Sequence, residues 1–103
     1  MSVINVTKEN FEAEVLKSDV LVLADFNAGW CGPCRAMKPM LDELAEGNTA
    51  YKIVSIDIDE EDELADEYDV SSIPCLVVFK GGEEVNRSVG LIPKDAIAEL
   101  VEG

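Results

Sequence analysis

The sequence feature that most constrains the fold is a nearly unbroken apolar run, VLVLADF, at residues 20–26. A strand with one face in water alternates apolar and polar residues, and this run lacks that alternation. It therefore predicts a strand buried on both faces, as in a parallel sheet that helices cover on each side. The apolar patterns at residues 51–59 and 75–80 predict two further buried strands.

Helical patterns lie on either side of the first of these strands. A β-prone segment at residues 3–6 precedes a helix for which Thr7 is the expected N-cap. Residues 34–46 have helical periodicity, with Pro39 expected to kink the helix and Gly47 expected to end it.

The C-terminal half contains a third helix, a hairpin and a last helix. Asp59 is expected to cap a short acidic helix with residues 60–62 in its first turn, where the helix dipole favours negative charge. Gly81-Gly82 is a two-residue hairpin signal that leads into a strand at residues 84–89. Pro93 is expected to be the first residue of the last helix.

These elements follow the order β-α-β-α-β-α-β-β-α, which predicts the α/β class. The first half has the pattern of right-handed parallel crossovers, and the end has that of an antiparallel hairpin covered by a helix. We expect a three-layer α/β/α sandwich with a central mixed sheet of about five strands and four flanking helices. A chain of 103 residues is expected to form a single domain, residues 1–103.

Composition and charge narrow the classes of function. Eight basic and 22 acidic residues give a net charge of −14 at pH 7, which disfavours nucleic acid and anionic membranes as partners. The acidic excess serves solubility or a preference for basic partner surfaces, and the sequence does not choose between them. No apolar run approaches the ~18 residues of a membrane span. No signal peptide is visible, so we expect a cytoplasmic location. We also expect the protein to be a monomer.

Residues 29–39, GWCGPCRAMKP, hold the candidate chemistry. The Cys31 and Cys34 pair could ligate a metal, form a structural disulfide or exchange disulfides. Structural zinc needs four ligands, and the chain offers three cysteines and no histidine. The absence of histidine also excludes Ser-His and Cys-His hydrolase sites. A disulfide closing two intervening residues would restrict the unfolded chain little.

Redox chemistry explains the cysteine pair better than either alternative. The pair lies between a buried strand and a helix, and a helix N-terminus stabilises a thiolate through its unpaired N–H groups. Pro33 supplies a preset φ at the helix start, and Gly32 leaves backbone room for a substrate. A metal site and a structural disulfide stay open as weaker alternatives.

Three segments resemble the thioredoxin family: ADFNAGWCGPCRAMKP, SSIPCLVVFKGGE and VGLIP. The resemblance extends over essentially the whole chain. It implies the thioredoxin fold and a dithiol–disulfide oxidoreductase that reduces protein disulfides without a cofactor other than its own redox-active disulfide. It also implies two kinds of partner, a thioredoxin reductase that recharges the cysteine pair and disulfide-containing protein substrates.

The resemblance also implies roles for individual residues. Cys31 would be the exposed nucleophile that forms a mixed disulfide, and Cys34, more buried, would resolve it. Asp25 matches the buried aspartate to which the family assigns proton transfer, and burial should raise its pKa. The alternative for Asp25 is a structural, ion-paired carboxylate at a strand end.

Substrate binding is expected on the surface around the cysteine pair. Trp30 and the backbone of Ile73 would form the docking surface, and Pro74 matches the family's cis-proline. Gly90 would permit close approach on the opposite rim, next to Leu91. A binding or chaperone-like module that uses the same surface without the thiols is the alternative function.

Four positions depart from the commonest family pattern. Asn27 stands where an aromatic residue is usual, and Gly29 stands where proline or a polar residue is more usual. Ser55 stands where a lysine often pairs with the buried aspartate, so its presence should leave the pKa of Asp25 higher. Cys75 stands where threonine is usual, either as a small packed residue or as a third reactive thiol near the active site.

Overall fold

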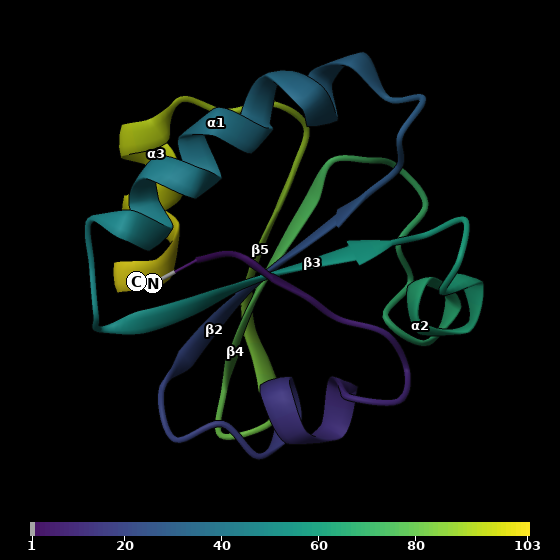
Figure 1. The fold of residues 1–103 in the computed structure, drawn as a ribbon, viewed down its shortest axis with the longest axis horizontal. Coiled ribbons are helices and arrows are strands. Elements are labelled where there is room, and N and C mark those ends of the chain that lie inside the picture. Colours follow the sequence, from purple (N-terminus) through teal and green to yellow (C-terminus); the bar gives the residue numbers. More distant parts are fainter. Residues whose placement is uncertain (1) are drawn as a thin grey trace.

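One mixed sheet of five strands forms the centre of the protein in the computed structural model, which describes residues 2–103 (Figure 1). The strands are β1 (Ile4–Asn5), β2 (Leu21–Asn27), β3 (Tyr51–Asp57), β4 (Cys75–Lys80) and β5 (Glu83–Val89). Their order is β1-β3-β2-β4-β5. β1, β3 and β2 are parallel, whereas β4 and β5 pair antiparallel. The predicted mixed sheet is confirmed, and residue 1 of the expected domain lies outside the described residues.

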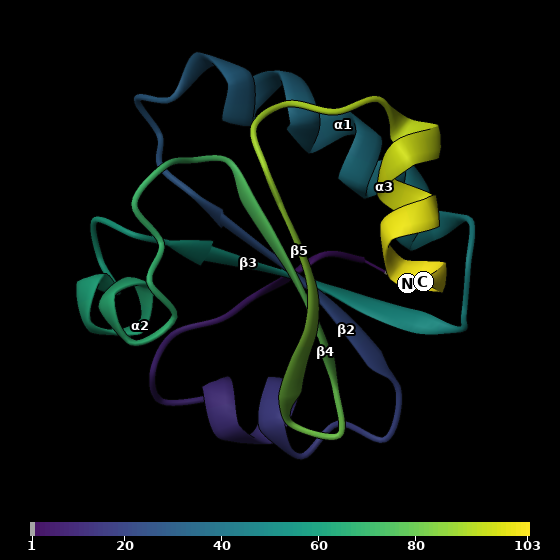
Figure 2. The ribbon, with the colours of Figure 1, turned by 180° about the vertical axis from the view of Figure 1, so that it is seen from behind.

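Four helices cover the sheet among the described residues. They are η1 (Glu12–Leu16), α1 (Gly32–Glu46), α2 (Asp62–Glu67) and α3 (Lys94–Glu102). α1 and α3 lie together on one face, and η1 and α2 lie across the sheet from them, as the views from front and back show (Figures 1 and 2). The three-layer α/β/α sandwich expected from the element order is confirmed.

Each face of the sheet has its own apolar core. On the α1 and α3 side, Met37 and Ile97 pack with Leu23 of the central strand. On the other side, an aromatic cluster joins η1, α2 and β4, with ring centroids 5.3 Å apart for Tyr68 and Phe79 and 6.1 Å apart for Phe11 and Phe79. β2 is therefore buried on both faces, as its unbroken apolar run predicts.

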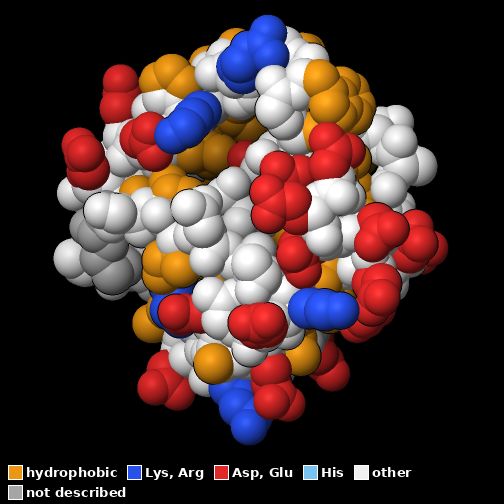
Figure 3. All heavy atoms as spheres, turned by 45° about the vertical axis from the view of Figure 1, so that its right-hand side comes forward, with side chains coloured by type: hydrophobic (Ala, Val, Ile, Leu, Met, Phe, Trp, Pro, Cys, Tyr) orange, Lys and Arg blue, Asp and Glu red, His pale blue; other side chains and the backbone are white. Residues whose placement is uncertain are grey.

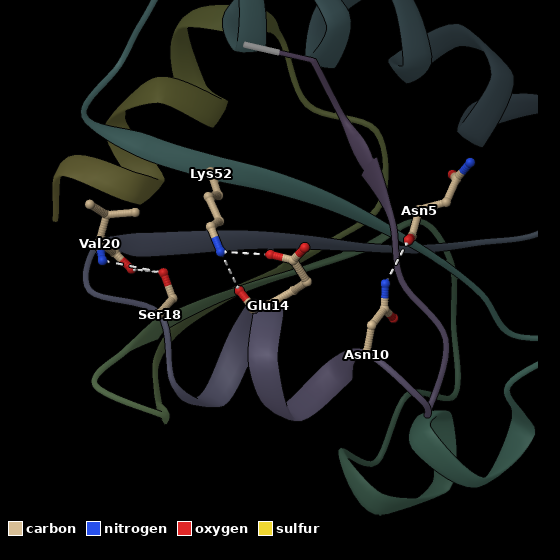
Figure 4. Close-up of polar contacts among 6 residues, drawn as sticks. All are labelled: Asn5, Asn10, Glu14, Ser18, Val20 and Lys52. Atoms are coloured by element: carbon tan, nitrogen blue, oxygen red, sulfur yellow. Dashed lines mark hydrogen bonds and ion pairs between the residues drawn. The ribbon is translucent and has the colours of Figure 1, made fainter.

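The first helix differs from its prediction in start and type. Thr7 is not its N-cap: the Thr7 hydroxyl accepts a hydrogen bond from the Glu9 N–H at 3.3 Å within a separate turn. η1 follows as one short π-helix, in which the Lys17 N–H donates to the Glu12 carbonyl at 2.8 Å. The Asn10 side chain bonds to Thr7 and to the carbonyl of Asn5, and these contacts close the turn before a helix begins (Figure 4).

Three other helix starts also differ from prediction. In α3, Pro93 is the N-cap, and Lys94 is the first helical residue. Asp59 does not cap the acidic helix, because its N–H donates to the Asp57 carboxylate at 2.8 Å in a turn that ends β3. α2 begins at Asp62 with Glu61 as its N-cap. α1 begins two residues earlier than predicted, at Gly32, and continues through Pro39.

An ion pair connects η1 to the sheet. The Lys52 ammonium group of β3 donates to both the carboxylate and the backbone carbonyl of Glu14, at 2.9 and 3.0 Å (Figure 4). The two groups are partly buried, so solvent screens the pair less than an exposed one. Lys52 therefore holds η1 against the N-terminal end of the parallel strand pair.

The β4–β5 hairpin turns at Gly81 and Gly82, as predicted. Both residues have positive φ, +59° and +84°, which a two-residue turn of this kind requires and glycine adopts without a Cβ penalty. A Cβ on Gly82 would lie 2.9 Å from the Leu16 carbonyl oxygen at the end of η1, whereas one on Gly81 would meet nothing within 4 Å. Gly82 therefore serves both the turn and the packing of η1 against the hairpin.

We expect Gly82→Ala to destabilise the protein more than the matched control Gly81→Ala. Both replacements carry the left-handed penalty of about 1–2 kcal/mol, and only Gly82→Ala adds a clash with a backbone oxygen. Urea unfolding of the two variants measures the difference. Equal losses of stability would contradict the close packing of Gly82 on η1.

Candidate active site

The cysteine pair forms a disulfide at the N-terminus of α1. Cys31 is the N-cap, and its Cα lies 5.2 Å from that of Cys34. The Cys34 N–H donates to the Cys31 sulfur at 3.2 Å, so the helix terminus directs a hydrogen bond at this atom. Pro33 lies in the first turn, and a Cβ on Gly32 would meet nothing within 4 Å. This geometry would stabilise a thiolate on Cys31 after reduction.

The expected difference in exposure between the two cysteines is wrong for the disulfide form. Both residues are 5% exposed. The bridge holds the two sulfurs in contact, so each covers part of the other. What distinguishes them is their surroundings, because Cys34 lines a cavity that also contains Asp25 and Cys31 does not.

That cavity has a volume of about 470 Å³ and lies between α1 and the carboxyl ends of β2 and β3. Asp25 and Cys34 belong to its wall, together with Asn5 and Ser55. Arg35 also lines it, but its guanidinium donates to the Gly29 carbonyl at 2.8 Å. Figure 3 shows a hollow near the top of the face that it draws, with basic side chains beside the hollow. The cavity therefore brings Cys34 and the buried carboxyl group of Asp25 to one wall.

Asp25 is buried at 5% exposure, as the apolar run around it predicts. Burial raises the pKa of its carboxyl group from 3.8 to about 7, and a hydrogen bond from Asn27 opposes part of that rise. The oxygen Oδ1 has no hydrogen-bond partner among the described residues. No ion pair with Asp25 is found among the described residues, which is against the ion-paired alternative, and the carboxyl can gain or lose a proton near neutral pH.

A polar network beside Asp25 was not foreseen from the sequence. The amide nitrogen of Asn27 donates to the Asp25 carbonyl at 2.9 Å, to the Asp25 carboxylate oxygen Oδ2 at 3.2 Å and to the Ser55 hydroxyl at 2.8 Å. Spacing of two along a strand puts Asp25 and Asn27 on one face, which the sequence could have suggested. The contact with Ser55 depends on the β2–β3 register, which pairs Asp25 with Ser55.

The expected substrate-binding residues lie on separate loops at the edge of the sheet where β2 leads to the disulfide. Trp30 is 66% exposed, and its indole N–H donates to the Asp59 carboxylate at 2.9 Å. The Ile73–Pro74 bond is cis, and the Pro74 carbonyl accepts a hydrogen bond from the Gly90 N–H at 2.8 Å. This bond joins the two loops, and the exposed Leu91 continues the surface. Asp59 is a member of this rim that the sequence analysis had assigned to a helix cap.

The thioredoxin family model matches residues 2–103. The chain belongs to the thioredoxin family. It is 50% identical to the thioredoxin of Bacillus subtilis (strain 168) over 102 residues, which cover 98% of this chain and 96% of that protein. It is 45% identical to thioredoxin 1 of Nostoc sp. (strain PCC 7120) over 98 residues, 94% of this chain and 92% of that one.

A solved structure agrees with the family assignment. A mutant thioredoxin from Halobacterium salinarum NRC-1 superposes with a TM-score of 0.88 at 41% identity, covering 98% of this chain and 88% of that one. Membership of the thioredoxin family, together with the Cys31–Cys34 pair, supports the predicted dithiol–disulfide oxidoreductase function. None of the helices in residues 2–103 has the length and apolar character needed to span a bilayer.

Cys75, the third cysteine of this thioredoxin-family chain, is free and 1% exposed. It pairs with Phe26 in the β2–β4 register, whereas its neighbour Leu76 pairs with Asp25. Because side chains alternate along a strand, Cys75 faces the core opposite the Asp25 cavity. Burial also raises the pKa of its thiol. Within residues 2–103, no cluster of three Cys, Asp or Glu side chains could hold a metal ion.

We expect the stability of this thioredoxin-family protein to fall between about pH 4 and pH 7 because of Asp25. The folded carboxyl has the higher pKa, about 7 against 3.8, so in this window the folded state binds more protons than the unfolded state. Stability is fully present below the lower value and is lost as pH rises through the higher one. Asp25→Asn should remove this loss, up to about 4 kcal/mol.

Denaturant unfolding at several pH values tests this prediction, with Asp19→Asn at an exposed position as the control. The gain in stability from Asp25→Asn should grow from pH 4 to pH 7 and then level off. A gain that does not change with pH would contradict a raised pKa for Asp25.

The burial of Cys75 predicts two classes of thiol in the reduced protein. Cys31 and Cys34 should react with a thiol reagent quickly, and Cys75 only after denaturant is added, because its thiol is covered and its pKa raised. Counting labels by mass spectrometry measures this. Three labels on the native protein would favour a reactive role for Cys75.

Proposed function

We propose that this chain reduces disulfide bonds in other proteins, with Cys31 as the nucleophile, Cys34 as the resolving thiol and Asp25 as the proton acceptor for Cys34. One observation supports these roles above the others. The disulfide lies at a helix N-terminus, and Cys34 lines the same cavity as a buried carboxyl with a pKa of about 7. No zinc or histidine chemistry is needed, because the electrons come from the two thiols themselves.

In the first step, the Cys31 thiolate attacks one sulfur of the substrate disulfide. A mixed disulfide forms, and the other substrate sulfur leaves as a thiolate that takes a proton from water. The position of Cys31 at the N-cap of α1 lowers the cost of the attacking anion. Gly32 and Pro33 provide an uncrowded helix start at which the substrate can approach.

In the second step, the Asp25 carboxylate takes the thiol proton of Cys34. The Cys34 thiolate then attacks the Cys31 sulfur, and the second substrate sulfur leaves as a thiolate that takes a proton from water, while Asp25 returns its proton to the solvent. The protein ends with the Cys31–Cys34 disulfide, and the substrate has gained two electrons and two protons. A carboxyl with an ordinary pKa near 4 would be a weaker base than one whose pKa is about 7.

The substrate would lie in an extended conformation across the rim that surrounds the disulfide. Trp30 and Leu91 offer exposed apolar surface, and Ile73 lies next to the cis Pro74. The Gly90 loop is held to Pro74 by a backbone hydrogen bond, so both sides of the rim keep a defined separation. A short extended segment of a protein substrate fits such a surface.

A thioredoxin reductase would return the disulfide to the dithiol. A dithiol donor works in a compartment that keeps thiols reduced, and on that ground we place the protein in the cytoplasm. We propose that it acts as a single-domain monomer and needs no cofactor or metal. With a net charge of −14, it would not bind nucleic acid or an anionic membrane surface.

Single cysteine variants test the proposed order of attack. In an insulin-reduction assay with a chemical dithiol or a thioredoxin reductase as donor, Cys31→Ser and Cys34→Ser should both lose turnover. Only Cys34→Ser should accumulate a mixed disulfide with the substrate, because its nucleophile remains and its resolving thiol is gone. Cys75→Ala is the control, and its turnover should match that of the parent protein.

Two outcomes would contradict the proposal. A mixed disulfide that forms on Cys31→Ser instead would reverse the assignment of the two cysteines. Full cellular function of the double Cys31→Ser, Cys34→Ser variant would favour a thiol-independent binding module.

A further inference from the structure

We propose that Asn27 is a positioning residue for the proton-transfer step: its side-chain amide, shared between Ser55 and Asp25, holds carboxylate oxygen Oδ2 and leaves Oδ1 to take the proton of Cys34. This inference rests on the proposed function, because it concerns the same transfer. It adds a residue at the end of β2, and an atom of Asp25, that the two-cysteine mechanism alone does not specify.

The contacts of Asn27 support the first part of this inference. Its amide nitrogen carries two hydrogens but lies within hydrogen-bond distance of three acceptors. The contacts with the Ser55 hydroxyl and the Asp25 carbonyl are 2.8 and 2.9 Å, and that with Oδ2 of Asp25 is longest at 3.2 Å. The hydrogen bond from Asn27 to the Asp25 carboxylate is therefore the weakest of the three. The Ser55 hydroxyl competes with the carboxylate for the two amide hydrogens.

The two carboxylate oxygens of Asp25 are consequently different. Oδ2 accepts from Asn27, whereas Oδ1 is buried and has no partner among residues 2–103. A hydrogen bond donated to one carboxylate oxygen stabilises the negative charge on that oxygen, so a proton binds it less readily. The incoming proton therefore goes to Oδ1. Asp25 and Cys34 line the same cavity, so the proton has a short route between the two side chains.

No other described group competes with Asn27 for the carboxylate. From α1 the titratable or charged side chains in the cavity wall are those of Cys34, Arg35, Lys38 and Asp42. The Lys38 ammonium nitrogen lies 3.7 Å from a carboxylate oxygen of Asp42, and the Arg35 guanidinium donates to the Gly29 carbonyl. Neither cation therefore pairs with Asp25. Asp57 lines the cavity from β3, whereas Cys75 on β4 faces the opposite core.

Because Asp25 and Ser55 share the amide of Asn27, we expect substitutions of Asn27 and Ser55 to shift the pKa of Asp25 in opposite directions. Asn27→Leu removes the donor at nearly constant size, so the Asp25 carboxylate loses its hydrogen bond. Ser55→Ala removes the competing acceptor, so an amide hydrogen becomes free to strengthen the bond to Oδ2. A loosened or wetter site would instead move the titration of Asp25 in the same direction in both variants.

The decisive measurement is the titration of the Asp25 carboxyl carbon by NMR in the full-length protein. We expect Asn27→Leu to raise the pKa of Asp25 and Ser55→Ala to lower it, each by about one pH unit. Ser55→Thr keeps the hydroxyl and should titrate like the parent protein. If Asn27→Leu does not fold, Asn27→Ala gives the same expected rise.

The pH profile of the resolving step supplies a second readout. The rate at which Cys34 releases a preformed mixed disulfide should have its midpoint shifted up in Asn27→Leu and down in Ser55→Ala. Shifts of both variants in one direction, or no shift in Ser55→Ala, would overturn the inference. This result is separate from the proposed function, which fails only if the cysteine variants keep turnover or trap the substrate on the wrong sulfur.

Discussion

The burial of β2 on both faces is the constraint on which the rest of the structure depends. Its two neighbours, β3 and β4, take its backbone hydrogen bonds, and helices on both sides cover its side chains. A strand in this position can carry a titratable group only at a high desolvation cost. The chain places one there, Asp25, and the first turn of α1 begins only a short loop further on. β2 therefore carries the buried Asp25 and leads through a short loop to the disulfide.

The uncompensated burial of Asp25 connects stability with chemistry. A partner cation would stabilise the charged carboxylate and lower its pKa, but the basic residues of the cavity wall are engaged elsewhere. What remains is the amide of Asn27, a neutral donor that offsets only part of the desolvation. The protein thus gives up stability at neutral pH and retains a buried carboxyl whose pKa is about 7, as the proposed proton transfer from Cys34 requires.

The rim around the disulfide comes from loops at several strand ends and not from one segment. Trp30 follows β2, Asp59 follows β3, Pro74 precedes β4 and Gly90 follows β5. Single hydrogen bonds join these loops in pairs, Trp30 to Asp59 and Gly90 to Pro74. Figure 3 shows many acidic side chains on one face of the molecule, and Trp30 and Leu91 of the rim are exposed apolar side chains. The same strand order therefore produces the fold and brings together the loops of the proposed substrate surface.

The element order, the hairpin glycines and the cysteine pair at a helix start could all be predicted from the sequence, because periodicity, turn chemistry and a spacing of three are local properties. The predictions of Thr7 and Asp59 as caps are wrong. Thr7 lies in a local turn with Glu9 and Asn10, whereas the carboxylate of Asp59 accepts a hydrogen bond from the distant Trp30. The tertiary structure alone decided that Ser55 lies beside Asp25, that Asn27 contacts both and that Cys75 faces the opposite core. Those facts follow from strand register, which brings together residues distant in sequence and cannot be deduced from the pattern of either strand alone.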